Sequence, residues 1–202
     1  MEFDEVVKKR RSIRKYIGKE ISLDKLILIL ESAKNSPSSG NLQDFRFIIV
    51  NDKDKKNKIA EACLKQDWMN SAPIFIVVCS DIKRLKEYYK SKADEYSLQN
   101  AAAAAMIISL KSTDLGLSSC WVSVFDQKEI SQILRIKEGV IPQIILTLGY
   151  EYTLPLKPPQ KISLDKILFF NKYGDKTTNV KNWGKENYLN KIKKLIKKSF
   201  SF

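Results

Sequence analysis

The sequence predicts a fold in which helices cover both faces of a central β-sheet. Helical and strand patterns alternate along the 202 residues, but without the regular spacing of a doubly wound fold. The segment 74–79 is apolar at every position, which is typical of a strand in a sheet that is covered on both sides. The length suits one domain with a sizeable core.

Three helices are expected in the first half of the chain. Acidic residues crowd the start of the segment 3–11 and basic residues its end, as the helix macrodipole favours; an extended segment over 12–16 follows. Ser22 is a good N-cap for a helix over 23–34, and a short amphipathic helix is expected over 55–65. The apolar positions expected on the buried face of the second helix are Leu23, Leu26, Ile27, Leu30 and Ala33.

Apolar runs rich in aromatic and β-branched residues predict four strands. These strands are expected at 45–50, 74–79, 118–125 and 143–150. Residues 85–113 form a predicted helical centre in two segments. A capping box from Asp126 to Glu129 opens a helix that ends at Leu134, and a last short helix is expected over 163–170.

Two segments are unusual in composition. The five consecutive alanines of 101–105 let another backbone approach closely, either inside a buried helix or where the helix crosses its symmetry mate in a dimer. Residues 185–200 place apolar side chains at helical spacing with lysines opposite, and we expect this helix to dock on protein rather than on a membrane. This second segment is a basic amphipathic extension of the chain.

The composition excludes several functions. The chain has no histidine, so a histidine general base, triad or metal site is excluded. The three cysteines are widely spaced, which argues against a disulfide framework or a zinc site and favours a reducing cytoplasm. No apolar run is long enough to span a membrane, and the acidic start predicts that there is no signal peptide.

The net charge of +13 has two interpretations, nucleic-acid binding and a lysine-rich surface. Much of the excess lies in 185–198, and the chain has no zinc-finger spacing, RNA-recognition aromatic motif or basic zipper. We favour the lysine-rich surface.

Two polar clusters are candidates for ligand binding. The usual nucleotide loops are missing, but Arg10, Arg11 and Ser12 offer two guanidinium groups and a hydroxyl at a helix end. Arg14 points to the same side as Ser12 if the segment is extended. This cluster is either a phosphate site or a solvated helix end. The loop 36–43 is either an ordinary turn or a rigid polar edge for a flat ligand.

Five motifs in this order resemble the nitroreductase family of FMN-dependent oxidoreductases. They are RRSIRKY at 10–16, PSSGNLQ at 37–43, AP at 72–73, GLSSCWV at 116–122 and LGY at 148–150. The resemblance covers 3–173, and it implies an FMN-binding domain over 1–173 followed by a basic amphipathic C-terminal extension over 174–202. It implies an α+β fold with a central mixed β-sheet flanked by helices, built as an intertwined homodimer with two FMN molecules at the interface.

The resemblance also implies roles for individual residues. Arg10, Arg11 and Ser12 would hold the FMN phosphate and adjacent ribityl oxygens, and Arg14 would lie near the pyrimidine edge of the flavin. Lys161, at a position that is usually Arg, would close on the phosphate. The other subunit would contribute Pro37, Ser38, Ser39 and Asn41. The backbone that would face the ring is that of Val122, Ser123 and Val124.

Three positions depart from the family pattern. Asp44 replaces a common Pro, Phe45 replaces a common Trp, and Ser123 stands where many members have Gly. The first two follow the polar loop directly, and the third lies where the backbone would face the ring.

The activity implied by the resemblance is hydride transfer from NADH or NADPH to a small organic acceptor by a ping-pong mechanism. The acceptor would be a nitroaromatic, quinone or enone, and neither a metal nor a catalytic side chain is expected because the flavin carries the chemistry. No nucleic-acid or membrane partner is expected. The alternative is a non-enzymatic flavin-binding or basic nucleic-acid-binding protein, which the colour of the purified protein would help to distinguish.

Overall fold

The computed structural model describes residues 1–152 and 159–176. The predicted helix over 185–200 therefore lies outside the described residues. The chain divides into two compact units, Met1–Thr153 and Leu154–Phe202. The boundary between these units, at 153/154, lies before the predicted domain end at residue 173. The predicted end marks where the family resemblance stops, which is a different criterion, so it stays a prediction.

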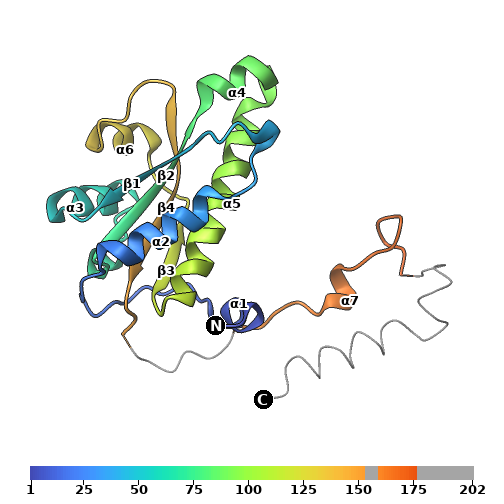
Figure 1. Ribbon diagram of the computed structural model, residues 1–202, viewed down its shortest axis with the longest axis horizontal. Coiled ribbons are helices and arrows are strands. Elements are labelled where there is room, and N and C mark those ends of the chain that lie inside the picture. Colours follow the sequence, from blue (N-terminus) through green and yellow to red (C-terminus); the bar gives the residue numbers. More distant parts are fainter. Residues whose placement is uncertain (153–158, 177–202) are drawn as a thin grey trace. The chain divides into compact units, whose positions relative to one another are not determined.

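The first unit is built on a four-stranded sheet (Figure 1). Its strands are β1 (Phe45–Val50), β2 (Ile74–Asp81), β3 (Ser118–Val122) and β4 (Val140–Gly149), in the spatial order β1-β2-β4-β3. All three neighbouring pairs are antiparallel. An isolated parallel bridge joins Ser12 to Ser119 of β3 and gives the sheet its mixed character.

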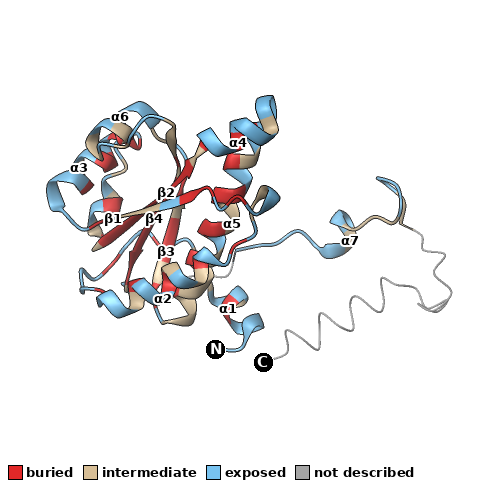
Figure 2. Ribbon diagram, turned by 45° about the horizontal axis from the view of Figure 1, so that its top comes forward, coloured by how far each residue is buried: buried red, intermediate tan, exposed pale blue. Residues whose placement is uncertain are grey.

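Helices cover both faces of the sheet, as predicted (Figure 2). They are α2 (Leu23–Lys34) and α5 (Ala93–Asp114) on one face, and α3 (Lys53–Ala62) and α6 (Gln127–Ile133) on the other. Side chains alternate along β2: Ile76 and Val78 pack with α2 and α5, whereas Phe75 and Val77 pack with α3 and α6. Each such burial stabilises the fold by about 1.5–3 kcal/mol, so the fully buried β2 is the centre of both cores.

Within residues 1–152 the first unit contains two further helices, which lie near predicted positions, and three short 3₁₀ turns that were not predicted. They are α1 (Phe3–Lys9), α4 (Ile82–Tyr89) and the 3₁₀ turns η1 (Ser39–Asn41), η2 (Asp67–Ser71) and η3 (Lys90–Lys92). The predicted helical centre is confirmed as two segments, α4 and α5. Asp126 accepts a 2.9 Å hydrogen bond from the Glu129 N–H at the start of α6, as the capping box predicts. Asp52 caps α3 in the same way, so that helix begins earlier than predicted.

The predicted buried face of α2 is partly wrong. Leu26 and Ala33 are buried, but Leu23 and Ile27 are 66% and 49% exposed, and Ile29 is fully buried instead. Positions 26, 29 and 33 have the three- and four-residue spacing of one helix face. Because apolar residues surround this helix, only its contact with α5 and the sheet decides which of them are inside.

The alanine run 101–105 packs inside the chain. Ala101, Ala104 and Ala105 are fully buried in the core that α5 forms with α2 and the sheet. Their small side chains let α5 lie close to the strands. Burial of the helix within one chain is therefore enough to explain the alanines at these three positions.

The boundaries of β4 and of the last helix differ from the predicted ones. β4 begins at Val140, although Pro142 cannot donate to the sheet, because a register shift at Val78/Cys79 opposite the proline accommodates it. In the second unit, helix α7 (Leu164–Ile167) is shorter than predicted, and the Ser163 hydroxyl bonds the Asp165 side chain instead of capping the helix.

Candidate functional site

Residues 12–16, which follow α1, form hydrogen bonds with the sheet through some positions and are exposed at others. Ile13 donates its N–H to the Ser119 carbonyl at 3.0 Å, and the buried Tyr16 donates its hydroxyl to the Ile13 carbonyl at 2.7 Å. The Tyr16 hydroxyl also lies 2.8 Å from the Thr147 hydroxyl, and burial raises its pKa. With Ile13 and Tyr16 inside, Ser12 and Arg14 are exposed, as the extended segment predicts.

The three arginines of this segment differ in how far they are engaged. Among the described residues, the guanidinium of Arg10 has no hydrogen-bond or ion-pair partner. Arg11 donates to the carbonyls of Lys8 and Arg10 at the end of α1, which is a helix-capping contact. The guanidinium of Arg14 lies 5.6 Å from the centre of the Trp68 ring, a cation–π distance. Arg10 is thus the cation with all of its donors available.

The thiol of Cys120 marks where these groups converge. Burial raises the pKa of Cys120, while the cations of Arg14 and Arg10 and a hydrogen bond from Ser12 oppose the rise. The structure therefore brings Arg10, Ser12 and Arg14 together beside the start of β3. The guanidinium of the half-buried Arg10 and the hydroxyl of the exposed Ser12 are donors suited to a phosphate ester, and the exposed Arg14 adds a second cation nearby.

The polar loop between α2 and β1 is held from below by buried side chains. Asn100 of α5 accepts hydrogen bonds from the Ser39 N–H and hydroxyl at 3.0 and 3.1 Å. Its amide donates to the Asp44 carboxylate at 2.6 Å, and the Ser80 hydroxyl donates to the same carboxylate. Pro37 and Asn41 are exposed, and Ser38 and Ser39 are half-buried.

The predicted ring-facing backbone lies just beyond β3. Val122 is the last residue of the strand and its side chain is buried. Ser123 is exposed, and its hydroxyl accepts a 2.5 Å hydrogen bond from the Trp121 indole. Val124 is 58% exposed. The chain thus leaves the sheet at Ser123, where the predicted strand over 118–125 was expected to continue.

One chain does not bring the polar loop and the arginine cluster to the same place. Asn100, which holds Ser39, and Ser109, whose hydroxyl lies 2.8 Å from that of Ser119, are both on α5. Their nine-residue separation corresponds to about 14 Å along the helix. In Figure 1 the loop lies near the start of α5, and the segment after α1 lies near its end. Lys161 is an exposed residue of the second unit.

Several side chains that make buried or long-range contacts give no signal in the sequence. Asn100 and Trp68 carry no local pattern, and Asp44 was noticed only as a departure from the family. The Lys56 ammonium donates to the carbonyls of Ala72 and Pro73 at 2.7 and 3.2 Å, and burial lowers its pKa. A lysine in an amphipathic helix gives no sign that its ammonium is buried, so only the tertiary structure identifies this contact.

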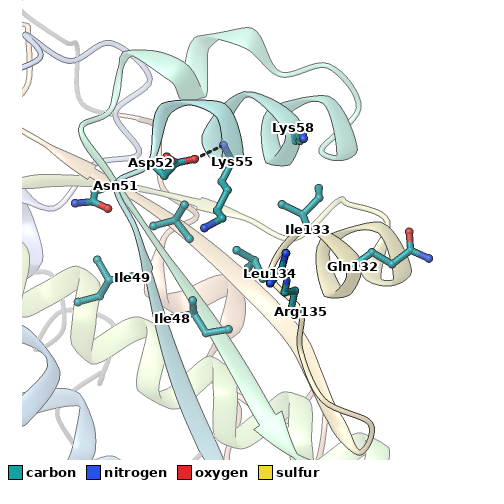
Figure 3. A pocket seen from close by; sticks show the side chains of 11 residues that line it. Ile48, Ile49, Asn51, Asp52, Lys55, Lys58, Gln132, Ile133, Leu134 and Arg135 are labelled. Atoms are coloured by element: carbon teal, nitrogen blue, oxygen red, sulfur yellow. Dashed lines mark hydrogen bonds between the residues drawn. The ribbon is translucent and has the colours of Figure 1, made fainter.

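A separate cavity lies at the β1 edge of the sheet (Figure 3). It has a volume of about 610 Å³, with an apolar wall from β1 and the end of α6 and cations from Lys55, Lys58 and Arg135. None of the predicted FMN residues lines it. Size alone does not make it the functional site, because a site shared between two subunits would be only half formed in one chain.

Residues 1–152 and 159–176 contain no group of three side chains suited to hold a metal ion. No helix in these ranges has the length and apolar character needed to cross a bilayer.

The fold is that of an α+β protein, with Arg10, Ser12 and Arg14 on the segment that bridges to the third strand. A model of the nitroreductase family matches residues 7–66 and 62–150, which is well over half of the chain. The chain therefore belongs to the nitroreductase family, and the predicted family and fold class are confirmed.

Three similar proteins illustrate the match. An Archaeoglobus fulgidus protein with the provisional name NADH dehydrogenase/NAD(P)H nitroreductase is 34% identical over 145 residues, or 70% of this chain and 80% of that one. A Bacillus subtilis protein named as an FMN reductase that uses NAD(P)H is 28% identical and aligns over 78% of this chain and 70% of its own. The structure of an FMN-dependent nitroreductase from Clostridium difficile R20291 is 30% identical, with a TM-score of 0.69 over 83% of this chain and 98% of that one.

Proposed function

We propose that this protein is an FMN-dependent oxidoreductase that takes hydride from NADH or NADPH and passes it to a small organic acceptor. The observation that carries the proposal is the donor set of the half-buried Arg10 and the exposed Ser12 and Arg14, on the segment that bridges to β3 at Ser119. The Bacillus subtilis and Clostridium difficile relatives, named as FMN reductase and FMN-dependent nitroreductase, support the same cofactor. When bound, FMN supplies the redox chemistry.

The residues of the chain would bind and orient this cofactor. Arg10 would pair with the phosphate, and Ser12 would hydrogen-bond to it or to the ribityl chain. Arg14, kept over the Trp68 ring, would place a positive charge at the pyrimidine edge, where negative charge develops on reduction. Lys161 would add a cation to the phosphate.

We propose that the complete site forms in a homodimer. The loop residues Pro37, Ser38, Ser39 and Asn41 would reach the cofactor of the partner subunit, and the backbone of 122–124 would face its ring. Support comes from the separation of the two clusters along α5. Further support comes from large exposed apolar side chains on α1, α2 and α5, namely Phe3, Val7, Leu23, Ile27, Leu28 and Met106. Such surfaces are typical of protein interfaces.

Donor and acceptor would use one site in turn, which gives ping-pong kinetics. The acceptor class that the family resemblance implies is a nitroaromatic, quinone or enone, for which the flavin supplies the redox chemistry. The cytoplasm is the proposed location, since Cys63, Cys79 and Cys120 are all free thiols in buried positions.

The purified protein is expected to bind about one FMN per chain and to prefer FMN to FAD. An arginine cluster at a helix end suits a terminal phosphate, which FAD lacks. Flavin titration of the apoprotein measures both affinities, and NADH or NADPH should bleach the bound flavin. Equal or tighter binding of FAD, or no flavin binding at all, would contradict the proposal.

Arg10→Ala is expected to weaken FMN binding more than it slows the chemistry. Loss of one charge-assisted hydrogen bond costs about 1.5–3 kcal/mol, which is about a 10- to 150-fold loss of affinity. Saturating FMN should then restore most of the turnover. Lys9→Ala is the matched control, because Lys9 is an exposed cation at the same helix end. An Arg10→Ala enzyme that stays inactive when saturated with FMN would assign Arg10 another role.

A further inference from the structure

A buried chain of hydrogen bonds links the sheet to the polar loop. The Ser80 hydroxyl of β2 and the Asn100 amide of α5 both donate to the Asp44 carboxylate, and Asn100 in turn accepts from Ser39. Ser80, Asp44 and Asn100 are 0%, 1% and 4% exposed. Polar groups buried to this degree are costly unless every one of them is satisfied, so the four residues depend on one another.

The donor and acceptor groups of these four residues fix the direction of each hydrogen bond. The carboxylate of Asp44 only accepts and the N–H of Ser39 only donates, so the Asn100 amide has a single workable orientation. The Ser39 hydroxyl donates to Asn100, which leaves its lone pairs for an outside donor. The Ser38 hydroxyl accepts from the Gln43 N–H at 2.9 Å, which leaves its proton for an outside acceptor.

The loop needs such support because its backbone is strained. Gly40, Asn41 and Gln43 have φ values of 57°, 56° and 49°. The left-handed region is natural for glycine and tolerated by Asn, but it costs about 1–2 kcal/mol for a residue such as Gln43. Strained conformations of this kind persist where the surroundings over-determine them and are frequent at ligand sites.

We propose that Asp44 and Asn100 are positioning residues of the FMN site. They hold the loop in its strained shape and present Ser38 as a donor and Ser39 as an acceptor, side by side. The polar edge of a flavin carries both complementary groups, carbonyl oxygens and an imide N–H. This inference rests on the proposed function, in which the loop contacts the FMN of the partner subunit.

A reciprocal exchange of the two side chains tests the proposal. Asn100→Asp places two carboxylates against each other and should lower FMN affinity at least tenfold. Asp44→Asn should have a smaller effect, because the new amide can still form hydrogen bonds with both Asn100 and Ser80. The double variant Asp44→Asn/Asn100→Asp should bind FMN within threefold of the wild type, since the carboxylate then accepts from Ser39 and the amide. Gln99→Glu is the control, because it makes the same charge change at an exposed neighbour on α5.

Two measurements separate positioning from mere stabilisation. FMN affinity is measured well below the unfolding temperature of each variant, and hydrogen exchange of the Ser39 and Gln43 amides is followed without flavin. Faster exchange in Asn100→Asp, with recovery in the double variant, is the expected result. The proposal would be overturned if Asn100→Asp left FMN affinity unchanged, or if the double variant Asp44→Asn/Asn100→Asp did not recover it.

If the proposed function is wrong, the experiment gives a different result from the one expected if only the positioning role is wrong. A wild-type protein that binds no FMN would overturn the proposed function and the cofactor role of Asp44 and Asn100 with it. The exchange rates of the apoprotein would still show whether these two residues hold the loop. A wild-type protein that binds FMN while all variants keep its affinity would overturn the positioning role alone.

Discussion

Gly149→Ala is expected to lower the free energy of unfolding by about 3 kcal/mol, at the upper end of typical overpacking costs. A Cβ at this position would lie 2.6 Å from Cδ1 of Tyr16 and 2.8 Å from Cδ of Pro73. Both contacts are parts of rings close to the main chain, so neither can move away cheaply. The unfolding temperature should fall by about 6–12 °C, as measured by thermal denaturation.

The same substitution should also weaken FMN binding. Tyr16 anchors the segment that carries Ser12 and Arg14 through its bonds to Ile13 and Thr147, and displacing its ring displaces that segment. Gly18→Ala is the control: a Cβ there meets no atom within 4 Å, although its φ of 68° carries a backbone cost of about 1 kcal/mol. If Gly149→Ala were no more harmful than Gly18→Ala, the close packing at Gly149 would be refuted.

Co-expression of Arg10→Ala and Asn41→Ala chains is expected to restore native FMN affinity at about a quarter of all sites. In the proposed dimer each site takes Arg10 from one subunit and Asn41 from the other. A mixed dimer then has one site with both defects and one site with none. With random two-fold pairing, half of the dimers are mixed, which gives the quarter. Flavin retained after dialysis measures the native fraction.

Co-expression of Arg10→Ala with Ser12→Ala is the matched control. Both residues lie in the cluster beside Cys120 of one chain, so every site keeps one defect and no recovery is expected. If the first pair also failed to recover, with mixed dimers demonstrated by mass, the shared-site proposal would be wrong. The two mixtures together separate subunit sharing from a general effect of co-expression.

Local patterns were sufficient for most of the secondary structure. The continuous apolar run of β2 predicts a sheet covered on both sides, and both cores meet on it. The capping box at Asp126 marks the start of α6 within one residue. Such signals are reliable because they depend on neighbours in the sequence, through periodicity and through orphan amides at helix ends.

The two halves of the predicted site depend on different ranges of interaction, and one chain does not bring them to the same place. The motif at 10–16 predicted that Ser12 and Arg14 share one side, and both are exposed. Its pattern did not reveal that Arg11 caps α1 or that Trp68 lies under Arg14. The contact between Arg14 and Trp68 joins elements that are far apart in sequence, so no local spacing encodes it. The Arg11 contacts are local, but they depend on where α1 ends, and that helix ends two residues before the predicted position.

The sequence by itself determined the family, the helices and strands, and the segments that carry the polar groups. The tertiary structure decided which apolar faces are buried, as the exchange of Ile27 for Ile29 on α2 illustrates. It also decided that Asp44 and Asn100 form a buried pair beneath the polar loop. The physical reason is that burial and hydrogen-bond partners arise from the packing of distant elements, whereas sequence patterns report the backbone's local preferences.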